Sequence, residues 1–492
     1  MLQHGGSEVY NVKTLFEDYS VTTNFMGPSI KGTENINNYL NSINHYPPTD
    51  KKYFSKGLEF LKTDSENIIW GNGASELIDL TIRYLKNKYN YNTFSKGEEV
   101  QFMEYERSCI NSNLSYNKIS GDILIIINPN NPTGTFFKHS ELISIINEKL
   151  VAGGSLIIDE SMIFWLTDWE NYSCMFNNEL HNLLDQKNAK LIVVQSWTKI
   201  FSCTGLRFGS IWSNNKKLIK EIENYQVPWS VNILSYHYLN GCLEDKSYLS
   251  ETRKYTPILR KSMYDFIKKE FPFVSIYGEH FLSWLWVDFK SEDLVQKIYD
   301  ELFNNGIVIR RGKIGYKQNT FIRFAVRSEE KNKYLFELLL NVKDTIFKPT
   351  YLFPIDKSII YGIVNINTSY LLEHEKIISE RKKNLQTYLE NNDYFILPSI
   401  IVCSKTLVII DGHHRFEIYK EKNITEIPVL LINYENKHII THSENPIDKE
   451  LVIKSAINKE LLPPKSTKHV IKDVNDQLRP LISLSILLPF CT

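Results

Sequence analysis

The sequence predicts an α/β fold with more than one domain. Three short apolar runs, at residues 123–127, 156–158 and 191–194, are each bounded by polar or turn residues. Such runs are typical of strands buried on both faces of a parallel sheet, and the segments between them have the spacing of amphipathic helices. The chain of 492 residues also exceeds the roughly 250 to 300 residues at which one hydrophobic core stops growing.

The stretch VKDTIFKPTYLFPIDKS interrupts this pattern, with Pro349 and Pro354 after a helical segment that ends near Val342. We therefore expect a first domain over residues 1–345, a linker over 346–357 and a smaller domain over 358–492. The second domain should begin with the strand IIYGIVNI, pass through a lysine-rich helix at residues 379–391, and reach the strand TLVII.

The composition points to small-molecule partners. Lysine plus arginine and aspartate plus glutamate both number 57, so no net field attracts nucleic acid or an anionic membrane. The six cysteines are scattered, and the N-terminal residues do not have the pattern of a secretory signal. We expect a cytoplasmic protein with no nucleic-acid partner and no membrane span.

One segment, SWTKIFSCTGLRFG, has a spacing that suggests cofactor chemistry. Lys199 lies three residues after Ser196 and eight residues before Arg207. A hydroxyl and a guanidinium at this spacing can both reach a phosphate that lies beside the lysine amine. A lone lysine is most often a surface residue, so the motif needs support from elsewhere in the chain.

That support comes from three segments upstream. Asp159 ends the predicted strand in LIIDES, and Asn131 lies in the tight turn of NPNNPTG. In GNGASEL, Gly73 precedes a helix whose first backbone N–H groups, at Ala74 and Ser75, can receive a phosphate. Together these residues offer a Schiff-base lysine, an anion for a pyridine nitrogen, a donor for a phenolic oxygen and a phosphate site, as pyridoxal 5′-phosphate requires.

In this order, the motifs resemble those of fold-type I pyridoxal-phosphate enzymes with the aspartate-aminotransferase fold. The resemblance, over about residues 1–342, is to the histidinol-phosphate aminotransferase group and especially to threonine-phosphate decarboxylases. Further similar segments are HGG at 4–6, DYSVTTNFMGPS at 18–29, HYPPTD at 45–50, EYER at 104–107 and VPWSVN at 227–232. The resemblance implies a homodimer, because sites of this fold are usually built at a dimer interface.

The resemblance also implies a substrate site. Arg310 in VIRRG would bind a substrate phosphate and Arg323 in FIRFAVRS a carboxylate, since the planar guanidinium forms bidentate pairs with both groups. His4 would join the phosphate site and Phe102 would stack on the pyridine ring. An asparagine of the family's phosphate pocket is replaced here by Thr22.

A second departure concerns the reaction. Aminotransferases usually have a tyrosine three residues after the pyridine-binding aspartate, but this position is Met162. The decarboxylase also lacks that tyrosine, which favours decarboxylation. Asn131 would contact both cofactor and substrate, and Lys199 would serve as the base if the Cα hydrogen were removed instead.

The expected second domain carries another polar constellation. DGHHR follows an apolar run at residues 407–410, which places Asp411, Gly412, His413, His414 and Arg415 at a strand-to-helix junction. Such a junction offers free backbone donors for phosphate. One acid, two imidazoles and a guanidinium suit a nucleotide polyphosphate with Mg²⁺, and the alternative is a solvated charged turn.

Two further segments, LLEHEK and LLPPKSTKHV, extend this constellation. The second supplies a compact set of donors: Lys465, Ser466, Thr467, Lys468 and His469. With DGHHR, these segments resemble free serine kinases of the α+β ParB and sulfiredoxin-like fold, over about residues 357–475. The resemblance implies that Glu375 is the general base and that Asp411 assists catalysis or holds Mg²⁺.

The two halves together suggest a bifunctional enzyme. The second domain would phosphorylate L-serine with ATP or ADP, and the first would decarboxylate O-phospho-L-serine to ethanolamine phosphate. Three alternatives stay open: threonine as substrate, a histidinol-phosphate-like aminotransferase, and a nucleotide or DNA sensor as the second domain. A sulfiredoxin activity is not expected, because DGHHR has no cysteine.

Overall fold

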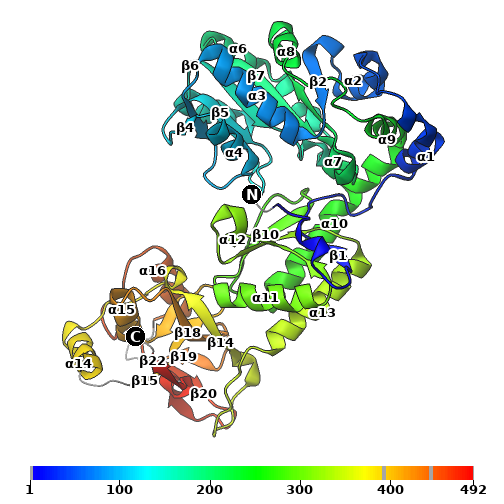
Figure 1. Ribbon diagram of the computed structural model, residues 1–492. Helices are drawn as coiled ribbons and strands as arrows, with labels where there is room; N and C mark the ends of the chain where they lie inside the picture. Colours follow the sequence, from blue (N-terminus) through cyan, green and yellow to red (C-terminus); the bar gives the residue numbers. More distant parts are fainter. Residues whose placement is uncertain (1–3, 391–394, 443–446, 491–492) are drawn as a thin grey trace.

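The computed structural model describes residues 4–390, 395–442 and 447–490. Three parts follow one another along the molecule in Figure 1: a large sheet with its helices, a small antiparallel sheet with long helices, and a C-terminal α/β part. The predicted first domain thus contains a large sheet, a separate small sheet and a two-stranded pair.

The large sheet has the strand order β2-β8-β7-β6-β5-β3-β4. Its strands are β2 (Ile68–Gly71), β3 (Thr93–Lys96), β4 (Ser115–Tyr116), β5 (Gly121–Ile127), β6 (Leu150–Asp159), β7 (Lys190–Ser196) and β8 (Gly209–Trp212). Strands β3 to β7 are parallel, and β8 is antiparallel to both of its neighbours. The three predicted parallel strands are confirmed as β5, β6 and β7.

Helices cover both faces of the large sheet (Figure 1). The helices of this part are α1 (Ile30–Asn38), α2 (Ser55–Leu61), α3 (Ala74–Tyr89), α4 (Glu104–Asn111), α5 (His139–Lys149), α6 (Asn178–Gln186), α7 (Trp197–Ile200), α8 (Lys216–Glu223) and α9 (Ile233–Glu244). Alternate residues of β5 enter two hydrophobic clusters: Leu124 and Ile126 the one with α5, Ile123 and Ile125 the one with α3. Burial on both faces explains why these strands are continuously apolar.

The small sheet has the order β12-β13-β10-β9, entirely antiparallel. Its strands are β9 (Ser275–Tyr277), β10 (Trp284–Asp288), β12 (Arg310–Arg311) and β13 (Phe321–Ala325), and its helices are α10 (Lys246–Glu270), α11 (Glu292–Asn304), α12 (Lys313–Tyr316) and α13 (Glu329–Asp344). Strand β1 (Glu17–Asp18) pairs with β11 (Ile307–Val308) and ties the N-terminal segment to this part.

Helix α13 ends at Asp344, and residues 345–356 form neither helix nor strand. Beyond them, a mixed sheet has the order β14-β18-β16-β17. The strands of this part are β14 (Ile360–Asn367), β15 (Phe395–Pro398), β16 (Ile400–Cys403), β17 (Ile409–Asp411), β18 (Glu426–Ile432), β19 (Ile439–Thr441), β20 (His469–Lys472), β21 (Leu478–Pro480) and β22 (Leu487–Phe490). The helices are α14 (Ser379–Glu390), α15 (His413–Glu421) and α16 (Lys449–Ile457).

The predicted elements of this part are found with two differences. IIYGIVNI forms β14, and the lysine-rich helix is α14, although residue 391 lies outside the described residues. The predicted strand TLVII is shorter, because β17 begins only at Ile409. Leu407 has a φ of 56° and its N–H donates to Cys403 O, so the chain turns tightly before the strand.

The C-terminal part packs on the small sheet. One hydrophobic cluster contains Phe271 and Phe289 from the small-sheet part together with Val364 and Leu431 from the C-terminal part. The cluster therefore runs without interruption between the two parts.

A buried ion pair lies beside this cluster. Lys290 Nζ is 2.7 Å from Asp288 Oδ2, with side-chain exposures of 8% and 2%. The same amine lies 4.3 Å from the centre of the Tyr370 ring, and Lys290 O accepts from Asn367 N at 2.9 Å. The Thr320 hydroxyl donates to Asp288 Oδ1 at 2.7 Å. Residues before and after the 345–356 segment are thus joined through one polar centre.

We predict that Lys290→Met lowers the free energy of unfolding by about 3 kcal/mol, since it leaves the Asp288 carboxylate buried without its cation. Lys297→Met is the control, because Lys297 forms an exposed pair with Asp293 and such pairs contribute about 0 to 1 kcal/mol. The measurement is the midpoint of urea unfolding of each variant. Equal midpoints for Lys290→Met and the native protein would contradict the prediction.

Candidate functional site

A cavity of about 700 Å³ lies at the carboxyl ends of β5, β6 and β7. The last residue of each strand, Ile127, Asp159 and Ser196, lines it. Its lining also contains these predicted residues: His4, Thr22, Ala74, Ser75, Phe102, Asn131, Lys199, Arg207, Arg310 and Arg323. The structure therefore brings together residues that the sequence spreads over about 320 positions.

Lys199 lies in the short helix α7, directly after β7. Its Nζ donates to Ser196 Oγ at 3.2 Å and to Thr198 Oγ1 at 3.3 Å. Burial, with a smaller contribution from Arg207, lowers the pKa of Lys199 to about 8. A much larger fraction of this amine is neutral near neutral pH than of an ordinary lysine, and the neutral form is the nucleophile.

Asp159 is a buried carboxylate with two donors. Tyr105 OH donates to Asp159 Oδ2 at 2.8 Å, and Ser161 N donates to Oδ1 at 2.8 Å. Burial raises the pKa of Asp159, while these hydrogen bonds and the charge of Lys199 oppose the shift. A buried carboxylate of this kind favours a cationic ligand atom. The sequence did not predict a role for Tyr105, although EYER, the segment that contains it, is one of those that resemble the decarboxylase.

The start of α3 supplies an anion site. Gly73 is the N-cap of this helix with a φ of 80°, and the free N–H groups of the first turn follow it. A Cβ atom at Gly73 would lie 2.6 Å from Arg207 Nη2, so only glycine permits the approach of this guanidinium. A helix N-terminus beside an arginine and the hydroxyls of Ser75 and Ser196 suits a phosphate group.

The two predicted substrate arginines are neighbours on the small sheet, where β12 pairs Arg310 with Arg323 of β13. Both residues are 5% exposed, and burial lowers the pKa of both. Arg323 donates to Asn131 Oδ1 and, at 2.5 Å, to Ser20 O, while its Nε has no partner among the described residues. Buried guanidinium groups are costly without anions, so this wall favours an anionic ligand.

The surroundings of Arg310 add to this preference. Its Nη2 lies 3.8 Å from Met103 Sδ, and its guanidinium carbon is 5.4 Å from the centre of the Tyr316 ring. Neither contact supplies a full negative charge. Tyr316 also donates to Asn131 Oδ1 at 3.4 Å, which places a hydroxyl in the cavity that sequence reasoning missed.

The remaining predicted residues line the cavity in different ways. Thr22 is buried and its carbonyl accepts from Ser283 Oγ at 3.0 Å. Phe102 is half-buried, with its ring centre 5.9 Å from that of His4. Met162 is buried and lines the cavity, so this position of the wall carries no hydroxyl.

The second predicted constellation is partly assembled in the C-terminal part. Thr467 Oγ1 donates to Glu375 Oε2 at 3.1 Å, and His374 Nε2 lies 2.8 Å from Thr467 Oγ1. His413 Nδ1 is 4.0 Å from Glu375 Oε1. Burial raises the pKa of Glu375 and lowers the pKa of His374 to about 4. The carboxyl group is therefore surrounded by neutral imidazoles and a hydroxyl.

The other residues of this constellation have partners of their own. Asp411 Oδ2 accepts from Arg415 Nη2 at 2.5 Å, which engages the carboxylate expected to assist catalysis or hold Mg²⁺. His414 Nε2 accepts from Ile378 N at 3.0 Å, and His469 Nε2 lies 2.8 Å from Tyr434 OH. In residues 4–390, 395–442 and 447–490, no group of three or more His, Cys, Asp or Glu side chains is arranged to hold a metal ion.

The backbone of this region has a helix that begins directly after a strand. Gly412 is the N-cap of α15 with a φ of 110°, and the strand-to-helix junction predicted there is confirmed. The Lys468 carbonyl accepts from His442 N at 2.6 Å. Ser466 Oγ is buried and has no partner among the described residues.

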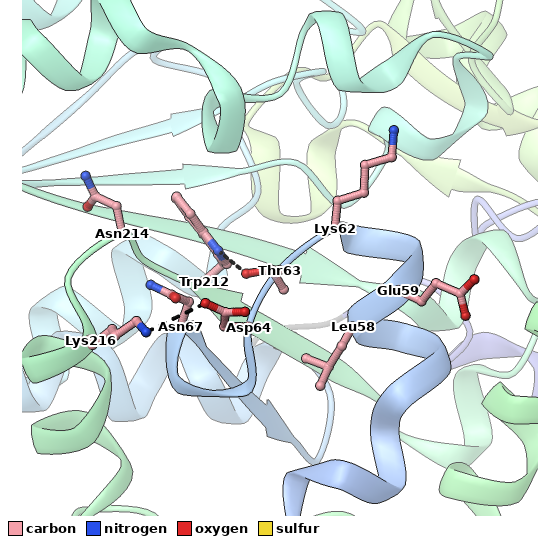
Figure 2. A pocket seen from close by; sticks show the side chains of 9 residues that line it. All are labelled: Leu58, Glu59, Lys62, Thr63, Asp64, Asn67, Trp212, Asn214 and Lys216. Carbon is pink, nitrogen blue, oxygen red and sulfur yellow. Dashed lines mark hydrogen bonds and ion pairs between the residues drawn. The ribbon is translucent and has the colours of Figure 1, made fainter.

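Another cleft, of about 570 Å³, lies on the outside of the large-sheet part beside Trp212 (Figure 2). Three of its charged side chains are engaged: Lys216 pairs with Asp64 and also with Glu66 nearby, and Lys62 pairs with Glu170. The Trp212 indole donates to Thr63 Oγ1 at 2.8 Å. This cleft offers little unsatisfied polarity to a ligand.

The cavity residues fit pyridoxal 5′-phosphate. A buried amine of lowered pKa, a buried carboxylate, an amide and a helix N-terminus beside an arginine are the groups that this cofactor needs. With the α/β fold, they define a pyridoxal-phosphate-dependent enzyme of fold type I.

Comparison with known proteins gives the family. Residues 23–339 match the model for aminotransferase class I and II, and the chain belongs to this family. It is 28% identical over 354 residues to a putative threonine-phosphate decarboxylase of Caldanaerobacter subterraneus, covering 68% of this chain and 93% of that protein.

Two solved structures share the fold. The histidinol-phosphate aminotransferase from Clostridium acetobutylicum is 25% identical with a TM-score of 0.56, covering 67% of this chain and 99% of its own. The histidinol-phosphate aminotransferase from Sinorhizobium meliloti in complex with pyridoxal-5′-phosphate is 15% identical with a TM-score of 0.56, covering 65% and 89%. Within the described residues, no helix is long and apolar enough to cross a membrane.

We predict that Tyr105→Phe weakens cofactor binding about tenfold, because Asp159 loses a donor that favours its charged form. Tyr116→Phe is the control, since Tyr116 donates to the exposed Glu99. The dissociation constant of the cofactor, measured by fluorescence, distinguishes the variants. Equal affinities in native protein and Tyr105→Phe would contradict a role of this hydroxyl.

A second prediction concerns pH. Because the pKa of Lys199 is lowered to about 8, its neutral fraction rises about tenfold between about pH 7 and 9 and then stays constant. The rate at which cofactor-free protein combines covalently with pyridoxal phosphate should follow this curve in stopped-flow absorbance. A rate that kept rising beyond about pH 10, as expected for an ordinary lysine, would show that burial does not set the reactivity of Lys199.

Proposed function

We propose that the chain is a bifunctional enzyme. Its C-terminal part would phosphorylate L-serine with ATP or ADP and Mg²⁺, and its N-terminal part would decarboxylate O-phospho-L-serine to ethanolamine phosphate. The observation that carries the proposal is the pair of buried arginines, Arg310 and Arg323, in the same cavity as Lys199. A substrate with two anionic groups would neutralise both.

Each arginine would bind one end of the substrate. Arg323, fixed by Asn131 and Ser20, would bind the carboxylate, and its unpaired Nε supports this role. Arg310 would bind the phosphate together with His4. As cross-strand neighbours, the two guanidinium groups would bind the two anionic groups of the substrate side by side and thereby fix its orientation at Cα.

The orientation of the substrate's bonds at Cα decides which reaction follows. The bound cofactor supplies an electron sink for whichever Cα bond stands perpendicular to its ring. The arginines would hold the carboxylate bond in that position, and Lys199, partly protonated near its pKa of about 8, would deliver the proton that Cα takes up when CO₂ leaves. Met162 places no hydroxyl beside this amine, in keeping with loss of CO₂ rather than amino transfer. Threonine stays an alternative to serine, because one methyl group changes binding by only about 1 to 3 kcal/mol.

The kinase half of the proposal depends on Glu375. Its burial raises its pKa, and Thr467 and His413 surround it. The carboxylate would accept the proton of the serine hydroxyl as the oxygen attacks the terminal phosphate of the nucleotide. The N-terminus of α15 after Gly412 and the unpaired Ser466 hydroxyl would bind phosphate oxygens.

We also propose a homodimer formed through the large-sheet part. Tyr46 and Trp229 stack with ring centres 4.3 Å apart and are 76% and 50% exposed. They belong to HYPPTD and VPWSVN, two of the segments that resemble the decarboxylase. Val227 beside them is 69% exposed. Exposed aromatic side chains grouped in this way are typical of a protein interface.

A second candidate is an aminotransferase of the histidinol-phosphate type, with the C-terminal part as a kinase or a nucleotide sensor. Tyr316 favours it, since this residue brings a hydroxyl into the cavity that could replace the one missing at Met162. Turnover that requires a keto acid would select this candidate.

One incubation separates the candidates. The protein is mixed with L-serine, ATP and Mg²⁺ without a keto acid, and phosphorus NMR follows the products. Ethanolamine phosphate is expected, and O-phospho-L-serine supplied directly should give it without ATP. Absence of this product in both reactions would sink the proposal.

Point changes should separate the two activities. Lys199→Ala should abolish decarboxylation and leave serine phosphorylation within about twofold of native, whereas Glu375→Ala should reduce phosphorylation at least about 100-fold and leave decarboxylation. Glu435→Ala, at an exposed pair with Lys405, is the control and should leave both unchanged. Loss of both activities from either of the first two changes would contradict two separate sites.

A further inference from the structure

Glu104, the first residue of α4, contacts His4 at the edge of the cavity. Its side chain is 8% exposed, and its Oε1 lies 2.8 Å from His4 Nε2. Its other oxygen, Oε2, accepts from Arg107 Nε at 2.7 Å. Arg107 thus fixes the carboxylate from within its own helix and leaves one oxygen for His4.

The chain next to His4 is held against the same wall. Gly6 N donates to Ser20 Oγ at 2.7 Å, and a Cβ atom at Gly5 would lie 2.4 Å from Ser20 O. This backbone contact places His4 reproducibly at the cavity. His4 and Arg310 also border the same small hollow that opens beside it.

The two nitrogens of the His4 ring therefore have different surroundings. Nε2 lies 2.8 Å from Glu104 Oε1, a buried oxygen that has no other partner among the described residues, which leaves Nδ1 for a ligand. The hydrogen bond from His4, with a smaller contribution from Arg107, lowers the pKa of Glu104, so the carboxylate keeps its charge.

We propose that Glu104 is a positioning residue for phosphate recognition: it orients the ring of His4, so that His4 and Arg310 together bind the phosphate of the phospho-amino acid. The proposal deepens the decarboxylase function proposed above and rests on it. Glu104 itself would touch neither substrate nor cofactor. Its effect should therefore appear in substrate affinity rather than in the rate of the chemical step.

The first test is steady-state decarboxylation of O-phospho-L-serine by the holoenzyme. Glu104→Gln should raise KM about tenfold and change kcat by less than about twofold, because the contact to the phosphate is weakened equally in the ground state and in the transition state. Glu106→Gln, two residues further along α4, is the matched control. Glu106 pairs with Lys96 at 3.1 Å and its side chain is 45% exposed, so its KM should stay native. An unchanged KM in Glu104→Gln would overturn the proposal.

A double substitution tests whether Glu104 acts through His4. His4→Gln should raise KM to the same extent as Glu104→Gln, and the double variant should show no further increase. The His4 side chain is 42% exposed, so this change is not expected to disturb folding. Multiplied effects in the double variant would show that Glu104 acts independently of His4 and would overturn the proposal.

Inorganic phosphate separates this inference from the proposed reaction. Calorimetric titration of the holoenzyme with phosphate should show about tenfold weaker binding in Glu104→Gln and in His4→Gln than in Glu106→Gln. If O-phospho-L-serine is not turned over while this difference is found, the decarboxylase function fails and the role of Glu104 stands. Equal phosphate affinity in all variants would overturn the role of Glu104, whatever the reaction.

Discussion

The site depends on three parallel strands that end at the same edge of the large sheet. Because β5, β6 and β7 run in the same direction and in register, their last residues meet at one edge of the sheet. Asp159 ends β6, Ser196 ends β7, and Lys199 follows within one helical turn. Any shift of register would move the carboxylate away from the amine.

Burial shifts the pKa values of these groups. The hydrophobic clusters on both sides of the sheet exclude water from its edge, and the same exclusion lowers the pKa of Lys199 and raises that of Asp159. Burial also lowers the pKa of the two arginines on the small sheet, because keeping their charged form away from water has a cost in free energy. A cofactor and a substrate that bring anions to the arginines and a cation to Asp159 would recover that cost, so binding and electrostatics are coupled.

The order of the motifs was enough to predict the large sheet, the cavity and most of its polar residues. Each of these motifs is local: a strand end, a turn or a helix start whose residue types reveal its geometry. Partners contributed by distant residues were not predictable in this way. Tyr105 reaches Asp159 across 54 positions, and Glu104 reaches His4 across 100, through side-chain packing that no local pattern records.

The C-terminal part shows the same limit. The strand-to-helix junction at Gly412 follows from a local pattern, but the pairing of Asp411 with Arg415 does not, because it depends on the rotamer that each side chain adopts. The turn at Leu407 was likewise not predictable, because its segment has the apolar pattern of a strand.

The buried ion pair of Lys290 and Asp288 limits where this chain can be cut into separate domains. Strand β10 ends at Asp288 and lies beside β13, which carries Arg323, while Lys290 holds Asn367 and Tyr370 of the C-terminal part. A chain cut near residue 345 would expose Phe271 and Phe289 to water and leave this ion pair without its cover. The C-terminal part thus covers an apolar face of the small-sheet part. A chain that ended near residue 345 would need polar residues in place of that apolar surface to remain in solution.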